Sequence, residues 1–140
     1  MSAFTISVAT ENEVREIQLG RRLRHFNYTL VGEYPEGQAI SLNAKDEAGN
    51  LLGGFRGEVS FGWLLINVLF VEKSERGKGL GRRLLAHGEN AAREKGALHA
   101  RLDTFEWQTP GFYLKQGYEE YCRMPNYFKS FALFLLRKDL

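Results

Sequence analysis

The stretch VEKSERGKGLGRRLLAHGENAAREKG, residues 71–96, joins a glycine-rich turn to the pattern of a long helix. Gly77, Gly79 and Gly81 come directly before that pattern, and four cations surround them: Arg76, Lys78, Arg82 and Arg83. A helix N-terminus carries unpaired N–H groups and a partial positive charge. Because glycine has no side chain, phosphate oxygens can reach the backbone N–H groups there. The stretch predicts a diphosphate site, with a solvated glycine-rich turn as the alternative.

The residues after the glycines recur with a helical period. Four of them mark one buried face: Leu80, Leu84, Gly88 and Ala91. Gly96 is the expected end of the helix, and Glu89 and Arg93 are expected to pair on its exposed side. The preceding residues 63–71, WLLINVLFV, are nearly all apolar and predict a strand covered on both faces.

The rest of the chain supplies further strands and helices around this centre. Working outward, we expect a strand at 4–9, a helix over 10–30, a hairpin over 39–61, a strand at 97–104, a short helix at 109–117, and closing strands at 118–124 and 128–138. This order predicts the α+β class, with a central mixed β-sheet flanked by helices. The length predicts a single domain over residues 1–140.

Composition excludes several classes of protein. The chain has 140 residues, 44% of them hydrophobic and 26% charged, which is typical of a globular domain. A net charge of +2 gives no support for a nucleic-acid partner. Cys122 is the only cysteine, and the sequence has no metal-ligand spacing and no apolar run of about 20 residues. We therefore expect a cytoplasmic protein without a disulfide, a metal or a membrane partner.

The glycine turn fits one known signature better than others. It lacks the Walker pattern and departs from the dinucleotide fingerprint at Arg82. Residues 76–81, RGKGLG, instead resemble the [QR]-x-x-G-x-[GA] signature of the GNAT acetyltransferases, after a buried strand and before a long helix. Residues 102–121, LDTFEWQTPGFYLKQGYEEY, resemble that family's second signature. The resemblance covers nearly the whole chain.

The resemblance implies acetyl-coenzyme A as co-substrate and indicates which residues would bind it. They are Leu69, Phe70, Val71, Arg76, Gly77, Lys78, Gly79, Leu80, Gly81 and Arg82. The N–H of Leu69 would polarise the thioester carbonyl, and Lys78, Arg82 or Arg83 would meet the ribose phosphate. Tyr113 would be the general acid for the departing thiolate, the alternative being an aromatic that only packs in the core.

The acceptor side is less defined by the pattern. Alternation places Asn67 on one face with Leu65 and Leu69, either as a structural amide at a strand irregularity or as a contact in the acceptor pocket. Asp103 is the first candidate for the base, followed by Glu58 and then Glu106. His25 is a further acceptor-side candidate because it titrates near neutral pH. The alternative for the four titratable candidates, Asp103, Glu58, Glu106 and His25, is that each is a solvated charge on the surface without a catalytic role.

Two further positions depart from the family pattern. Glu106 stands where the family's second signature usually has an asparagine, and Thr109 stands where it usually has alanine.

These features lead to two main hypotheses. The first is an N-acetyltransferase that moves acetyl from acetyl-coenzyme A to a primary amine of a small molecule or peptide by direct attack in a ternary complex. The second is a non-catalytic acyl-coenzyme A sensor or interaction module of the same fold. A small RNA-binding domain is disfavoured by the net charge of +2. A homodimer is left open.

Overall fold

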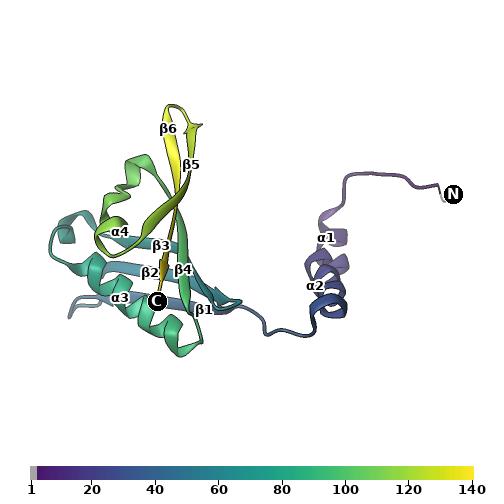
Figure 1. The fold of residues 1–140 in the computed structure, drawn as a ribbon, viewed down its shortest axis with the longest axis horizontal. Coiled ribbons are helices and arrows are strands. Elements are labelled where there is room, and N and C mark those ends of the chain that lie inside the picture. The colour runs from purple at the N-terminus through teal and green to yellow at the C-terminus, as the bar shows by residue number, and fades with distance from the viewer. Residues whose placement is uncertain (1–2) are drawn as a thin grey trace. The chain divides into compact units, whose positions relative to one another are not determined.

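The computed structural model describes residues 3–140 and divides the chain into two compact units (Figure 1). One unit ends at Pro35, and the other runs from Glu36 to Leu140. The expectation of a single domain over the whole chain stays a prediction.

The first unit contains two helices, α1 (Glu11–Ile17) and α2 (Leu19–Val31). A capping box starts α1: the Thr10 hydroxyl accepts a hydrogen bond from the Glu13 N–H, and the Glu13 carboxylate accepts one from the Thr10 N–H. The sequence predicts one continuous helix here, but Gln18 adopts a left-handed backbone with φ of 50° and separates the two.

The predicted strand at residues 4–9 is wrong. Those residues have no regular secondary structure. A strand needs a neighbouring strand to pair its backbone N–H and C=O groups. The first unit offers none among its described residues, so alternation of side chains alone does not produce a strand.

The second unit is built on a six-stranded sheet in the order β1-β2-β3-β4-β6-β5. The strands are β1 (Gln38–Lys45), β2 (Leu51–Ser60), β3 (Trp63–Val71), β4 (His99–Phe105), β5 (Glu119–Phe128) and β6 (Phe131–Asp139). The helices are η1 (Lys73–Glu75), α3 (Leu80–Glu94), η2 (Glu106–Gln108) and α4 (Gly111–Lys115). Strands β3 and β4 pair in parallel and the other neighbours pair antiparallel. The predicted mixed sheet with flanking helices is confirmed.

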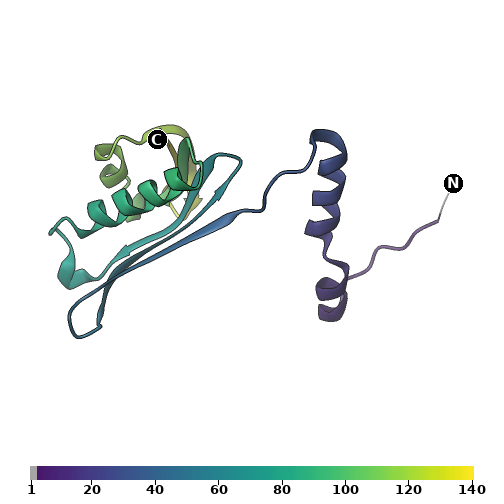
Figure 2. The same cartoon turned by 90° about the horizontal axis from the view of Figure 1, so that it is seen from below.

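Helix α3 lies along one face of the sheet (Figure 2). Its close approach depends on Gly88, because a Cβ at that position would lie 2.5 Å from the ring of Phe55. Leu85 of α3 is buried with Phe55, Leu64 and Leu102 in the core between helix and sheet. This packing holds the start of α3 against the end of β3.

The exposed pair predicted for α3 does not form. Glu89 is 6% exposed and accepts hydrogen bonds from the Tyr118 hydroxyl at 2.8 Å and from the Lys138 ammonium at 3.0 Å. Arg93 bonds to Asn90 at 2.7 Å instead. The helical pattern could not show this, because Lys138 comes from β6, about fifty positions further along the chain.

Strands β3 and β4 are neighbours along only part of their lengths. They pair at Trp63↔His99, Leu64↔Ala100 and Leu65↔Arg101, and β3 then continues to Val71 without a β4 partner among the described residues. The two strands therefore diverge, and the β4-side edge of β3 is open from residue 66 onward.

A bulge marks the point of divergence. On the β2 side, Gly57 pairs with Ile66 and Arg56 pairs with Val68, so Asn67 is an extra residue in β3. A bulge reverses which side chains face the core beyond it. Leu69 consequently packs against the core while Asn67 is exposed. The predicted shared face of Asn67 and Leu69 is wrong for this reason.

Candidate functional site

A cavity of about 750 Å³ opens where β3, the glycine turn and α4 meet. It is lined by Leu69, Phe70, Val71, Glu75, Arg76, Gly77, Gly79, Leu80, Gly81, Arg82, Trp107, Gln108, Thr109, Phe112 and Tyr113. Its size lies within the range of cofactor and small-molecule sites. We call it the larger cavity, because a second cavity described below is smaller.

The glycine turn forms one wall of the larger cavity. Gly77 and Gly79 have φ of 79° and 85°, a left-handed backbone conformation that residues with a side chain rarely adopt. Gly79 is the N-cap of α3 and makes no side-chain cap bond. The first N–H groups of a helix have no partner inside it. The start of α3 therefore presents backbone donors and the positive end of the helix dipole at the cavity wall.

The four cations of the turn have different positions. The Arg76 guanidinium donates to the Val71 carbonyl at 3.0 Å and lines the cavity, as does Arg82. Lys78 pairs with the Glu75 carboxylate at 2.9 Å and is not part of the lining. Arg83 is also outside the lining. The structure thus places two of the four cations at the cavity.

The open edge of β3 forms a second wall. The Glu72 N–H donates to the Leu52 carbonyl of β2 at 2.8 Å. Backbone groups of successive strand residues point to alternate sides. The N–H groups of Val71 and Leu69 therefore point away from β2, toward the open edge. The donor that the family resemblance assigns to Leu69 faces the cavity side of the strand.

Tyr113 of α4 closes the cavity on a third side. The residue is 9% exposed, and burial raises the pKa of its hydroxyl to about 12. Its ring packs edge-on against Phe112 at 5.1 Å and Tyr118 at 5.7 Å. The phenol therefore keeps its proton near neutral pH and can donate a hydrogen bond into the cavity.

Three of the acceptor-side candidates, Asn67, Asp103 and Glu58, do not line the larger cavity. Asn67 is the exposed bulge residue of β3, and Asp103 is exposed between the buried residues Leu102 and Thr104 of β4. Glu58 is exposed, with its carboxylate over the backbone of Gly37. His25 belongs to α2 of the first unit, where its ring contacts Tyr28 at 5.9 Å. Glu58, Asn67 and Asp103 lie on the three neighbouring strands β2, β3 and β4 of the second unit.

Sequence reasoning missed Trp107 and Gln108 as cavity residues. Both lie in η2, within the second signature, so their place between β4 and α4 was the available signal. The Trp107 ring stacks on Phe105 at 4.3 Å. Glu106 of the same turn accepts a hydrogen bond from the Ala132 N–H at 3.0 Å, which gives this carboxylate a structural role.

Residues 3–140 contain neither a metal-binding cluster nor a membrane-spanning helix. These residues hold no group of three or more His, Cys, Asp or Glu side chains placed to bind a metal ion. They also include no helix that is long and apolar enough to cross a membrane.

Comparison with known proteins matches this chain to acetyltransferases by family model, by sequence and by structure. The model of the acetyltransferase (GNAT) domain matches residues 37–120. The blasticidin-S acetyltransferase of Streptomyces morookaense is 37% identical over 119 residues, which cover 84% of this chain and 88% of the relative. The crystal structure of an acetyltransferase from Bacillus cereus ATCC 14579 has a TM-score of 0.84 at 31% identity, covering 98% of both chains.

A more distant structure shows the same fold with a ligand. It comes from a Bacillus anthracis protein assigned as a streptothricin acetyltransferase and was solved in complex with acetyl coenzyme A. The TM-score is 0.66 at 19% identity, covering 81% of this chain and 68% of the other. At this identity the likeness supports the fold alone.

Proposed function

This chain belongs to the GNAT acetyltransferases, and we propose that it transfers acetyl from acetyl-coenzyme A to a primary amine of a small molecule by direct attack in a ternary complex. One observation carries the proposal. The larger cavity is lined at once by residues of the glycine turn, by residues 69–71 at the open edge of β3 and by Tyr113. These are the three groups that a thioester with a diphosphate tail requires.

The residues present fit the cofactor. Backbone N–H groups from Gly77 to Arg82, at the start of α3, would hold the pyrophosphate, with Arg76 and Arg82 adding positive charge. The open edge of β3 would hold the extended arm through the backbone of Leu69 and Val71. The bound cofactor supplies an acetyl group activated as a thioester.

Two groups of this chain would assist the transfer itself. The Leu69 N–H stabilises charge on the carbonyl oxygen as the amine attacks. The Tyr113 hydroxyl donates to the sulfur as the carbon–sulfur bond breaks. A thiol has a pKa near 8.5, whereas that of Tyr113 is about 12. Complete proton transfer from the phenol is uphill, so its contribution is a hydrogen bond to the developing thiolate.

The attacking amine must lose a proton. An alkylamine with a pKa near 10.4 costs about 4–5 kcal/mol to neutralise at pH 7. Glu75, the one carboxylate of the larger cavity's lining, is paired with Lys78. We infer that the proton leaves through water, with Asp103 as the remote base and Glu58 second. Asn67, next to the divergence of the strands, and His25 are proposed as acceptor contacts.

One relative supports a choice of acceptor class. Since the Streptomyces morookaense protein is a blasticidin-S acetyltransferase and shares 37% identity, we favour a small, antibiotic-like amine over a peptide. Cytoplasmic location fits a reaction that consumes acetyl-coenzyme A. A homodimer remains part of the proposal, tested by the mass of the protein in solution.

The test is release of free thiol from acetyl-coenzyme A across a panel of amines that includes blasticidin S, basic peptides and simple diamines. We expect turnover with at least one small amine and a product heavier by one acetyl group in mass spectrometry. Binding of acetyl-coenzyme A without turnover on any amine would favour the non-catalytic sensor instead.

A further inference from the structure

A smaller cavity of about 310 Å³ lies in the second unit and shares no lining residue with the larger one. It is lined by Trp63 of β3, Arg101 of β4, Tyr121 of β5 and Arg137 of β6. Ala100 and Leu102, which flank Arg101 in β4, are buried in the core that contains α3. Arg101 therefore points to the opposite face of the sheet, and we call this space the Trp63 cavity.

Two like charges meet at the Trp63 cavity. Arg101 and Arg137 are direct partners in the antiparallel pairing of β4 with β6. Like charges directly opposite each other on two strands destabilise a sheet. Arg101 is exposed, and within the described part of the second unit it makes no hydrogen bond or ion pair. Carboxylates beside Arg137 offset part of the repulsion, whereas Arg101 has no such partner in that unit.

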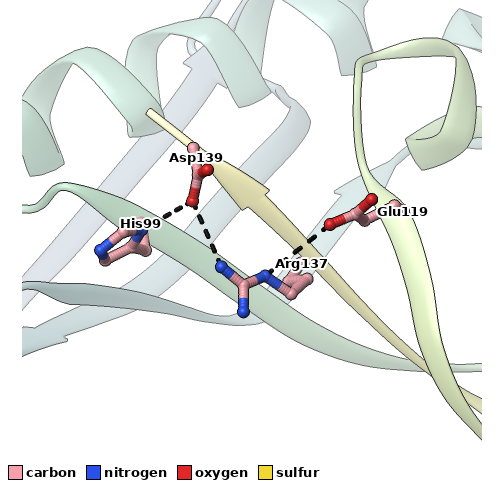
Figure 3. A network of polar contacts seen from close by, with 4 residues as sticks. All are labelled: His99, Glu119, Arg137 and Asp139. Atoms are coloured by element: carbon pink, nitrogen blue, oxygen red, sulfur yellow. Dashed lines mark hydrogen bonds and ion pairs between the residues drawn. The ribbon is translucent and has the colours of Figure 1, made fainter.

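The second guanidinium is held in place by its neighbours. Figure 3 shows Arg137 between Asp139 and Glu119, with distances of 3.3 Å from its Nη2 to Asp139 and 4.0 Å from its Nε to Glu119. Asp139 also bonds to the His99 ring at 2.7 Å. One carboxylate is thus shared between a histidine and an arginine, which fixes the orientation of the Arg137 side chain.

Aromatic rings complete the cavity. The Trp63 indole stacks on His99 at 4.5 Å, and the Arg137 guanidinium lies 5.1 Å from the centre of the same indole. Tyr121 is an extra residue in β5, because Glu120 pairs with Leu136 and Cys122 pairs with Leu135. The walls are therefore two aromatic side chains beside one oriented guanidinium and one without a partner.

We propose that the Trp63 cavity binds the carboxylate of a small organic acid with a flat apolar body, independently of the acetyl-coenzyme A site. The planar guanidinium fork matches a carboxylate in two hydrogen bonds. A carboxylate between Arg101 and Arg137 would replace their repulsion by two attractions, and the body of the acid would lie against Trp63 and Tyr121. The cavity volume suits a single-ring acid.

The experiment measures binding of benzoate to the full chain by calorimetry, with cyclohexanecarboxylate, acetate and inorganic phosphate as comparison probes. We expect benzoate to bind more tightly than acetate or phosphate. Arg101→Gln should weaken benzoate binding at least tenfold, and Arg101→Lys should recover only part of it, because lysine restores the charge without the fork. Arg93→Gln removes an exposed guanidinium on α3 and should change nothing.

Several results of this experiment would overturn the proposal. These are absence of benzoate binding at millimolar concentration, equal binding by parent and Arg101→Gln, and displacement of benzoate by acetyl-coenzyme A. Phosphate binding tighter than benzoate would also overturn the choice of a carboxylate.

A second measurement does not depend on choosing the right acid. If the arginine pair exists for a ligand, Arg101→Gln should raise the melting temperature of the free protein by about 1–3 °C, because one repulsion is removed. A lower melting temperature would show that Arg101 has a structural role, which contradicts the proposal.

Discussion

At the scale of single residues, Tyr113 carries the most specific prediction. Tyr113, which lines the larger cavity, keeps its ring and most of its buried area in Tyr113→Phe and loses only the hydroxyl. We expect kcat to fall about 10²-fold, the lower end of general-acid effects, because the pKa of about 12 limits the group to hydrogen bonding. Acetyl-coenzyme A binding should change little, since the loss occurs in the transition state.

Tyr118→Phe is the matched control for this change. Tyr118 is also buried and also in contact with the Tyr113 ring, but it does not line the larger cavity. Its hydroxyl bonds to Glu89, so the variant should lose stability and keep its kcat. A thioester with a more acidic thiol should narrow the difference between parent and Tyr113→Phe. Equal kcat values for these two proteins would leave Tyr113 as a core aromatic.

At the scale of elements, the role of the glycine turn in binding can be tested separately from the backbone strain that a substitution there introduces. Gly79 and Gly49 both have left-handed backbones, with φ of 85° and 87°, and Gly49 lies in the β1–β2 turn outside the cavity lining. Valine at either position should cost stability through the same strain. At Gly79 alone the branched side chain should also block approach to the backbone donors, and calorimetry should show at least tenfold weaker acetyl-coenzyme A binding.

The comparison of these two variants decides the assignment. If Gly79→Val binds acetyl-coenzyme A as tightly as Gly49→Val does, the turn is not the pyrophosphate site. If both bind weakly, general destabilisation is the cause, and the glycine turn again lacks support.

Elements were predictable from sequence where local pattern and tertiary partners agree. The hairpin of β1 and β2, the apolar strand β3 and the helix after the glycines all have strong periodicity and clear turn residues. The strand at residues 4–9 failed because pairing requires a neighbour that alternation does not reveal. Asn67 was placed on the wrong face because one bulge residue reverses the alternation beyond it.

The candidate site also has one side that could be predicted from the sequence and one that could not. The cofactor side depends on backbone groups in a contiguous segment, which the family resemblance assigned from Leu69 to Arg82. Of the residues assigned there, all but Lys78 line the larger cavity, and their contact with acetyl-coenzyme A stays a prediction. Trp107 joins the cavity from η2, and its place within the second signature was the available indication of that role. The acceptor side requires groups from separate strands to meet, and neither Asp103 nor Glu58 lines the larger cavity.

At the scale of the whole molecule, buried tyrosines link folding to alkaline pH. Burial raises the pKa of Tyr113 to about 12. The pKa of Tyr118 is raised as well, first by burial and then by the charge of Glu89 and its hydrogen bond. Both tyrosines have an ordinary pKa near 10 once the chain unfolds. Above pH 10 the unfolded chain therefore holds fewer protons than the folded one, and the sign of the linkage makes unfolding more favourable as pH rises.

We expect the free energy of unfolding to fall with a slope that approaches about 1.4 kcal/mol per pH unit for each of the two tyrosines as the pH rises above 10, beyond the contribution of exposed groups. Urea titrations at several pH values from about 9 to 11 measure that slope, and tyrosinate absorbance should rise in step with unfolding. Tyr118→Phe should be less stable near neutral pH, because its bond to Glu89 is lost, yet its stability should decline less steeply in alkali. Tyr127→Phe changes an exposed tyrosine and should leave the slope as in the parent. If the slopes of parent and Tyr118→Phe are parallel, Tyr118 ionises freely in the folded protein, and its buried bond to Glu89 does not persist in solution.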